Sequence, residues 1–160
     1  RPIPGAFYSS REELIQDTRQ VGFIRSIINN RDEAKLRRVW DRGIYINKRP
    51  DESDYNEYIQ EMLKQRCNDD AYWSLASFNI TNDFTGINNG NGHISDIKIP
   101  ILAFHGEKDY ICEPWQAKDN KEAFGKQMDL IMLDGAGHSS FTDYPEEIGN
   151  KFSNFVKDIL

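Results

Sequence analysis

The sequence predicts an α/β protein in which a run of helices is followed by two strand–helix units that share a parallel sheet. Up to about residue 80, apolar side chains recur at helical spacing and no convincing strand appears. Residues 81–96 are rich in Gly and Asn, which favour turns. Beyond them the pattern becomes strand, helix, strand, helix. This order implies parallel strands joined by a right-handed crossover.

The first two helices are predicted from a cap signal and from apolar spacing. The motif Ser10-x-x-Glu13 is a capping box, in which two side chains satisfy N–H groups of the first helical turn. Apolar positions continue at helical spacing as far as Ile28, so we expect one helix over this stretch. A second helix is expected to run from near Asp32, and Pro50 closes the segment.

Two further helices are expected before residue 80. The third lies behind a cap at Ser53 or Asp54 and has apolar residues in the i, i+3, i+4, i+7, i+8 pattern of an amphipathic helix. A fourth, shorter helix follows Asp69 and Asp70. The aromatic side chains that we expect to lie mostly in the core of this region are Tyr55, Tyr58, Tyr72, Trp73 and Phe78.

Two strands and two helices are predicted after the turn-rich segment. Residues 97–104 form a short apolar run in which Pro100 indicates a sheet edge or a strand start. A helix is expected to begin at Pro114 and to end near Gly125, and residues 128–133 form the second strand. The last helix begins at Pro145. The side chains that it is expected to bury are Ile148, Phe152, Phe155, Val156 and Ile159.

The predicted sheet is too small to be stable alone. At least three strands are normally needed, and parallel sheets are covered on both faces. We therefore expect residues 1–95 to be a helical region with a Gly/Asn-rich linker, and residues 96–160 to be the C-terminal part of a larger core. On this interpretation the fold is incomplete without an N-terminal half.

Composition narrows the functional classes. With 38% hydrophobic and 29% charged residues, the chain is typical of a soluble globular protein. The formal net charge of -6 disfavours a nucleic-acid partner, and no apolar run reaches the roughly 18 residues of a membrane span.

Cys67 and Cys112 lack a metal-type spacing and are expected to be free thiols in a reducing, cytoplasmic compartment. The chain begins at Arg1 without a methionine, so we expect that residues preceding it have been removed.

The chemistry is expected just past the ends of the two strands. The first strand leads into HGEKDYICEP, which contains Asp109, and the second leads into DGAGHSSF, which contains His138. Open α/β sheets bind their ligands at this edge. A carboxylate hydrogen-bonded to an imidazole fixes the tautomer of the ring, so that its other nitrogen can act as a general base. Asp109 and His138 are thus the candidate catalytic residues.

The pattern of these residues resembles the end of the α/β-hydrolase fold. The matching positions are Gly106, Asp109, Pro114, Gly135, Gly137, His138 and the helix start Pro145-Glu146. The resemblance implies a triad in the chain order nucleophile, acid, histidine, with Asp109 and His138 as the last two. The preceding helical region would then be the cap of the enzyme. No G-x-S-x-G motif is present, so the nucleophile (Ser, less often Asp or Cys) and the oxyanion hole would belong to an upstream half.

The function that this resemblance implies is hydrolysis of an ester, amide or similar bond in a small-molecule or short-peptide substrate, with no metal and no organic cofactor. An Asp nucleophile would instead imply dehalogenase or epoxide-hydrolase chemistry, and a non-catalytic binding protein is a further alternative. The fragment is expected to be inactive alone, and to self-associate or to be poorly stable. An acidic cluster is expected to be a solvated helix start or, in proline-iminopeptidase-like members, a site for a substrate amino group; it comprises Asp51, Glu52, Asp54, Glu57 and Glu61.

Other candidate residues near the motifs are expected to be structural. His105 is predicted to pack at the strand end, and His93 is predicted to be solvated. Ser139 and Ser140 are predicted to be turn or cap hydroxyls rather than nucleophiles. Cys112 lies three residues after Asp109, and a nucleophile so close in sequence to its own acid would need an unfamiliar geometry.

Overall fold

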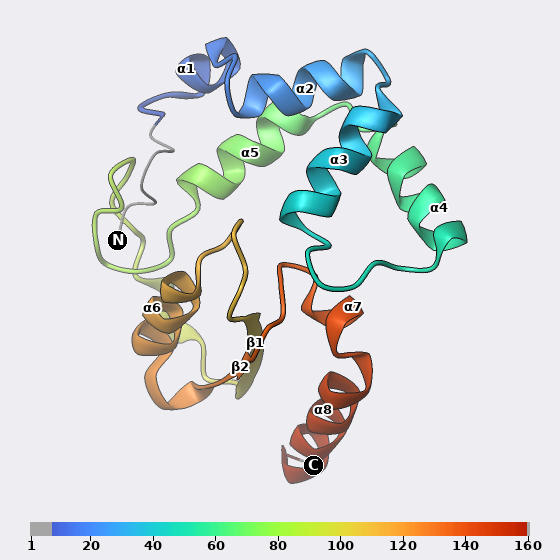
Figure 1. Ribbon diagram of the computed structural model, residues 1–160. Coiled ribbons are helices and arrows are strands. Elements are labelled where there is room, and N and C mark those ends of the chain that lie inside the picture. The colour runs from blue at the N-terminus through green and yellow to red at the C-terminus, as the bar shows by residue number, and fades with distance from the viewer. Residues whose placement is uncertain (1–7, 160) are drawn as a thin grey trace. The chain divides into compact units, whose positions relative to one another are not determined.

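The computed structural model describes residues 8–159 and shows a mixed α/β protein (Figure 1). The chain divides into two compact units. The helical unit comprises Arg1–Arg37 and Asn56–Asp96, and the sheet unit comprises Arg38–Tyr55 and Ile97–Leu160. Residues 38–55, which the sequence analysis assigned to the helical region, are thus grouped with the sheet.

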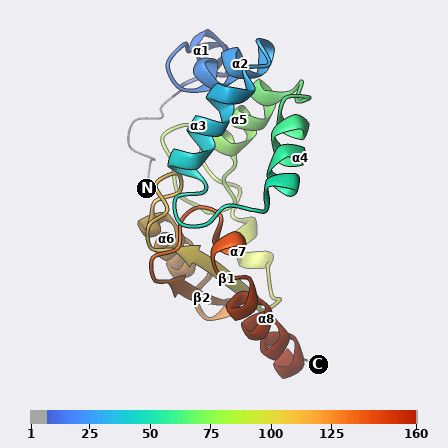
Figure 2. The same ribbon diagram turned by 45° about the vertical axis from the view of Figure 1, so that its right-hand side comes forward.

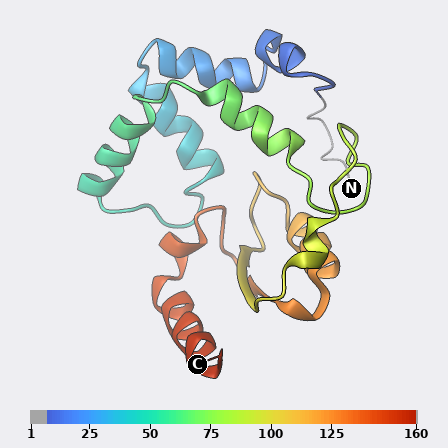
Figure 3. The ribbon, with the colours of Figure 1, turned by 180° about the vertical axis from the view of Figure 1, so that it is seen from behind.

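The helical unit is built on three helices, α1 (Arg11–Gln16), α2 (Val21–Asn29) and α5 (Asn68–Ser77). They contact one another, and Figures 1 and 3 show α2 and α5 side by side. An ion pair of 2.8 Å between Arg25 and Asp69 links these two helices. Helices α3 (Glu33–Gly43) and α4 (Glu52–Met62) belong partly to each unit. The buried apolar side chains of the helical unit are Leu14, Val21, Ile27, Ile28, Leu36, Ile59 and Leu63.

The single helix expected from Ser10 to Ile28 is two helices, α1 and α2. Ser10 caps α1 as predicted, because its hydroxyl accepts the N–H of Glu13. The carboxylate of Asp17 then accepts backbone N–H groups of the next turn, including those of Gln20 and Gly22, at 2.8 and 3.3 Å. An aspartate that bonds the backbone in this way competes with helix continuation. The prediction of a continuous helix was therefore wrong.

Helix α4 begins earlier than predicted. Its first intrahelical bond runs from the N–H of Tyr55 to the carbonyl of Asp51, so Asp51 occupies the capping position. Ser53 and Asp54, the predicted caps, lie inside the first turn. Glu52 and Asp54 are both acidic residues of that turn, where the helix dipole favours negative charge.

The aromatic residues expected in the core differ in their burial. Tyr55 is buried, and its ring lies 6.2 Å from that of Trp40 and 5.3 Å from that of Tyr45. All three belong to the sheet unit. Tyr58 and Phe78, in contrast, are exposed, which corrects the prediction for these two. Their positions on α4 and at the end of α5 carry them out of the cores of the described residues.

The segment between the last helix of the helical unit and the sheet is rich in turns, as predicted. A single antiparallel bridge joins Phe84 and Asn89, and a short 3-10 helix, η1, spans His93–Asp96. His93 is exposed, as expected, and its Nδ1 lies 2.9 Å from a carboxylate oxygen of Asp96. This exposed His–Asp pair provides a useful comparison for the pair in the sheet unit.

The sheet described here consists of β1 (Ile101–Gly106) and β2 (Met128–Leu133), which pair in parallel (Figure 2). The register places Ile101 beside Met128 and Gly106 beside Leu133, so both strands end at the same edge. The second strand matches its predicted bounds. The first was expected from residue 97 but begins at Ile101, which pairs with the first residue of β2, Met128.

Helices follow each strand. Helix α6 (Pro114–Phe124) and the 3-10 turn η2 (Gly125–Gln127) connect β1 to β2, and α6 contacts both strands. After β2 come α7 (Ser140–Asp143), which the sequence analysis did not predict, and α8 (Pro145–Ile159). The buried centre of this unit comprises Leu133, Ala136 and Ile148, with partly buried residues packed against it, namely Phe104, Ile131 and Tyr144.

Helix α8 buries less of its apolar face than expected. Ile148 is buried, but Phe152 is 56% exposed and Ile159 is also exposed, so the prediction was wrong for the far end of the helix. Phe155 and Val156 are only partly buried. Although α8 leaves these side chains open, neither it nor any other helix within residues 8–159 has the length and apolar character that crossing a membrane requires.

Candidate active site

The loops after β1 and β2 come together where the two strands end. The N–H of Glu107 donates to the carbonyl of Leu133 at 3.0 Å, and the N–H of Lys108 donates to that of Ala136 at 2.9 Å. At Gly106 the two loops touch so closely that an added Cβ would lie 2.3 Å from the carbonyl oxygen of Gly137. Only glycine fits here without displacing the backbone. The close approach brings Asp109 and His138 within reach of each other.

The carboxylate of Asp109 is fixed from both sides. The residue is 4% exposed. Its Oδ1 accepts the backbone N–H groups of Ile111 and Cys112, each at 2.9 Å, within the turn that Asp109 itself begins. Its Oδ2 lies 2.9 Å from Nδ1 of His138. Two backbone donors hold one oxygen in place, and the other is thereby aimed at the imidazole.

His138 is presented by a loop whose backbone is held at several points. Gly135 has a φ of +72°, a left-handed conformation that favours glycine. The N–H of Gly137 donates to the carboxylate of Asp143 at 2.7 Å, and the N–H of Ser139 donates to the carbonyl of Ile44 at 3.3 Å. The side chain of His138 is 34% exposed, so the ring contacts both the loop and the solvent.

Asp143 is the residue at this site that sequence reasoning missed. It is 1% exposed and lies at the end of α7. Besides the Gly137 N–H, its carboxylate accepts the backbone N–H of Lys48 at 3.0 Å, and its carbonyl accepts the Lys48 side chain at 2.7 Å. It therefore ties the His138 loop to the segment between α3 and α4. An Asp five positions after a histidine carries no recognisable motif, so only the fold could identify it.

The environment of His138 raises the pKa of its imidazole from 6.5 to about 9. The largest cause is the interaction with the sulfur of Cys112; partial burial acts in the opposite direction, and the hydrogen bond and charge of Asp109 raise the pKa further. The imidazolium form is therefore the stable one at neutral pH. The ring must lose this proton before it can serve as a base.

Cys112, which was not expected to be the nucleophile, lies beside the Asp109–His138 pair. The Sγ of Cys112, a carboxylate oxygen of Asp109 and a ring nitrogen of His138 all lie within 4.8 Å of one another. The thiol is free and partly buried. The turn that follows Asp109 brings it there, because the Cys112 N–H bonds to the Asp109 carboxylate. The site therefore combines an acid, an imidazole and a thiol.

The remaining candidates have structural partners. Nε2 of His105 lies 2.8 Å from the carbonyl oxygen of Cys112 and 3.8 Å from Oδ2 of Asp109, and the side chain is largely buried, as expected for a residue packed at the strand end. The Ser139 hydroxyl bonds to that of Thr142 at 2.8 Å. The buried Ser140 hydroxyl donates to the carbonyl of Gly137 at 3.2 Å.

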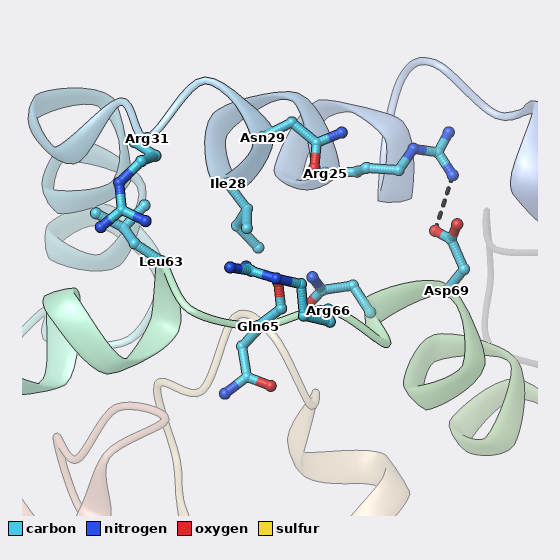
Figure 4. Close-up of a pocket in the computed structure, with 9 residues that line it drawn as sticks. Arg25, Ile28, Asn29, Arg31, Leu63, Gln65, Arg66 and Asp69 are labelled. Carbon is cyan, nitrogen blue, oxygen red and sulfur yellow. Dashed lines mark hydrogen bonds and ion pairs between the residues drawn. The ribbon is translucent and has the colours of Figure 1, made fainter.

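The helical unit contains a pocket of its own, of about 330 Å³. Figure 4 shows Arg25 in this pocket paired with Asp69, while Arg31 and Arg66 contribute two further guanidinium groups. The other lining residues are Ile28, Asn29, Leu63, Gln65 and Asn68. Neither Asp109 nor His138, the candidate catalytic residues, lines this pocket. The residues that line the pocket include no nucleophile paired with a base.

Comparisons of this chain with models of protein families and with curated proteins found no match.

Proposed function

We propose that this chain is the cap and the C-terminal part of the catalytic core of an α/β-hydrolase, with Asp109 and His138 as the acid and the base of its triad. The observation that carries the proposal is the 2.9 Å contact between Oδ2 of Asp109 and Nδ1 of His138, just past the ends of two adjacent parallel strands. This is the edge at which open α/β sheets bind their ligands.

Each residue would have a defined part in the reaction. Asp109, anchored by two backbone N–H groups, holds Nδ1 of His138 and stabilises the ring when it is charged. The other ring nitrogen, Nε2, would take the proton of the nucleophile and pass it to the leaving group. The carboxylate stays ionised throughout, and the proton moves only between the imidazole, the nucleophile and the leaving group.

The nucleophile and the oxyanion hole are proposed to come from outside these 160 residues. The hydroxyls of Ser139 and Ser140 are engaged by Thr142 and by the carbonyl of Gly137. The partly buried side chains along β1 and the exposed apolar end of α8 support the view that further strands and helices cover this sheet. In this family such a strand would end in the nucleophile.

The test uses the complete protein that carries this chain. We expect it to hydrolyse a p-nitrophenyl ester and to be labelled by a fluorophosphonate, which reacts with activated serines. His138→Ala should lower kcat by roughly three orders of magnitude or more, and Asp109→Asn should also lower it strongly, because loss of one triad member disables the unit. The 160-residue chain alone should give no His138-dependent turnover.

A matched control is available in the same chain. His93 also lies 2.9 Å from a carboxylate, that of Asp96, but this pair is exposed and belongs to the helical unit. His93→Ala should leave kcat/KM within about twofold, since surface changes have small effects. The proposal fails if the His138→Ala variant retains full activity. It also fails if the complete protein binds small molecules but hydrolyses none of the substrates. Turnover of an epoxide or haloalkane without labelling would indicate an Asp nucleophile.

A further inference from the structure

Asp109, Cys112 and His138 bring three kinds of metal-binding atom to one place. Their carboxylate oxygen, sulfur and ring nitrogen lie within 4.8 Å of one another. Thiolate, imidazole and carboxylate are ligands that Zn²⁺ accepts together, whereas Mg²⁺ and Ca²⁺ prefer oxygen alone. We propose that these three residues bind a thiophilic divalent cation such as Zn²⁺, with water at the fourth position.

The spacing suits an ion of this size. A tetrahedral zinc ion with bonds of about 2.0–2.3 Å sets its ligand atoms roughly 3.3–3.8 Å apart. The three atoms lie within 4.8 Å of one another, and Oδ2 of Asp109 is 2.9 Å from Nδ1 of His138, so binding requires each pair to move closer or apart by no more than about 1.5 Å. Asp109 and Cys112 belong to one tight turn and His138 to the adjacent loop. Side-chain rotations can therefore supply these small adjustments.

The ligands are also held by neighbours that would keep them in place. Oδ1 of Asp109 is occupied by the N–H groups of Ile111 and Cys112, which leaves Oδ2 directed at the site. The ring of His105 bonds to the carbonyl of Cys112 and supports the backbone of that residue. Such supporting hydrogen bonds orient the ligands and increase the affinity of metal sites.

Binding releases protons and forms three bonds. The ion takes an electron pair from the Cys112 sulfur as the thiol proton leaves for the solvent. It takes a second pair from a ring nitrogen of His138, and any proton on that nitrogen is released as the bond forms. The carboxylate of Asp109 supplies the third bond. No oxidant or reductant is involved.

The consequence for catalysis rests on the proposed function. If the ion binds Nδ1 of His138, it replaces the proton shared with Asp109; if it binds Nε2, it occupies the lone pair that would accept the nucleophile's proton. Either way the imidazole no longer acts as a base. The site would therefore make the enzyme sensitive to inhibition by zinc.

Metal binding is tested with Co²⁺ on the reduced, chelator-stripped chain. Co²⁺ occupies zinc sites and gives a near-ultraviolet absorption band when a thiolate binds it. We expect this band to saturate at one ion per chain and to disappear when Zn²⁺ is added. Cys112→Ser should abolish the band, and His138→Ala should weaken Co²⁺ binding by about tenfold or more. Circular dichroism checks that each variant is folded.

Two control variants make the assignment specific. Cys67→Ser removes the exposed thiol of the helical unit and should leave the band unchanged. His105→Ala should weaken binding less than His138→Ala does, because His105 supports the site without supplying a ligand. The proposal is overturned by the absence of a band, by a band that survives Cys112→Ser, or by one that depends on Cys67 or on His105 in place of His138.

A second measurement separates this proposal from the proposed function. The Co²⁺ band needs no nucleophile, so it appears even if the complete protein is not a hydrolase. If the complete protein hydrolyses esters, Zn²⁺ should inhibit it, and Cys112→Ser should raise the half-inhibitory Zn²⁺ concentration by at least about tenfold. Equal inhibition of both forms would contradict the ligand assignment.

Discussion

At the scale of single residues, the Asp109 carboxylate uses its two oxygens for different purposes. One oxygen closes the turn through the N–H groups of Ile111 and Cys112, and the other orients His138. The backbone therefore holds the carboxylate of Asp109 in place while this carboxylate holds the imidazole in a fixed direction.

The protonation of His138 gives a prediction that can be checked in this chain. Because its pKa is raised to about 9, mainly by the sulfur of Cys112, its ring protons should titrate near that value in an NMR experiment with a chelator present. Cys112→Ala should move the titration to lower pH, whereas Cys67→Ala should not change it. A midpoint that is the same with and without the Cys112 sulfur would contradict the assigned cause.

The same pKa makes stability depend on pH, and in the proposed hydrolase it should make activity depend on pH in the opposite direction. The folded state binds the His138 proton more tightly than the unfolded state does between about pH 6.5 and pH 9. The stabilisation is therefore complete below pH 6.5 and is lost as the pH rises through 9. Catalysis by a neutral imidazole should increase over the same range in the complete protein.

At the scale of elements, Asp17 decides where one helix ends and the next begins. It accepts the N–H groups of Arg19 and Gln20 in the connection and that of Gly22 in the first turn of α2. Burial alone would raise its pKa, but these backbone donors keep the pKa below its usual value. The turn is tight, since a Cβ at Gly22 would lie 2.0 Å from the carbonyl oxygen of Asp17.

We expect Asp17→Ala to lower the free energy of unfolding by about 0.5–2 kcal/mol, as loss of a helix cap does. Urea denaturation followed by circular dichroism measures this change. The difference from wild type should shrink as the pH falls through the lowered pKa of Asp17, because the protonated carboxyl accepts these N–H groups less well. Asp158→Ala, an exposed change in the last turn of α8, is the control and should alter stability much less.

Local signals account for most of the elements that were predicted from sequence. The second strand, and helix starts at Pro114 and Pro145, were correct because apolar runs and proline positions act within a few residues. The end of the first helix at Asp17 was missed because apolar residues continue at helical spacing on both sides of Asp17. The roles of Asp143 and of Cys112 depend on loops that meet only in the folded chain. The contact of Asp109 with His138 was expected from the parallel order of their strands.

At the scale of the whole molecule, two described strands form a sheet whose β1 residues are mostly half-buried. Helix α8 adds the exposed side chains of Phe152 and Ile159 to the apolar surface of the sheet unit. Exposed strand edges and apolar patches promote association between chains. The proposed hydrolase fold would cover the same surface with its other strands and helices.

We therefore expect the isolated chain to self-associate, with a weight-average mass that rises with concentration in sedimentation velocity. Phe152→Glu should reduce this association, because it places a charge on the exposed face of α8. Phe78→Glu is the matched control, since Phe78 is also exposed but belongs to the helical unit. A monomer with a sharp, cooperative melt, or association that depends on Phe78 instead, would argue against this surface.

The turn after Asp109 also has a consequence for how such a site can evolve. The acid is positioned by backbone N–H groups of the next residues, so the side chains at positions 110 and 111 take no part in holding it. Tyr110 and Ile111 are both exposed on that turn. Substitutions at these two positions that keep the backbone N–H can therefore change the exposed surface beside the acid while the acid keeps its orientation. Inherited variation in the side chains of this turn is thus separated from the orientation of its acid.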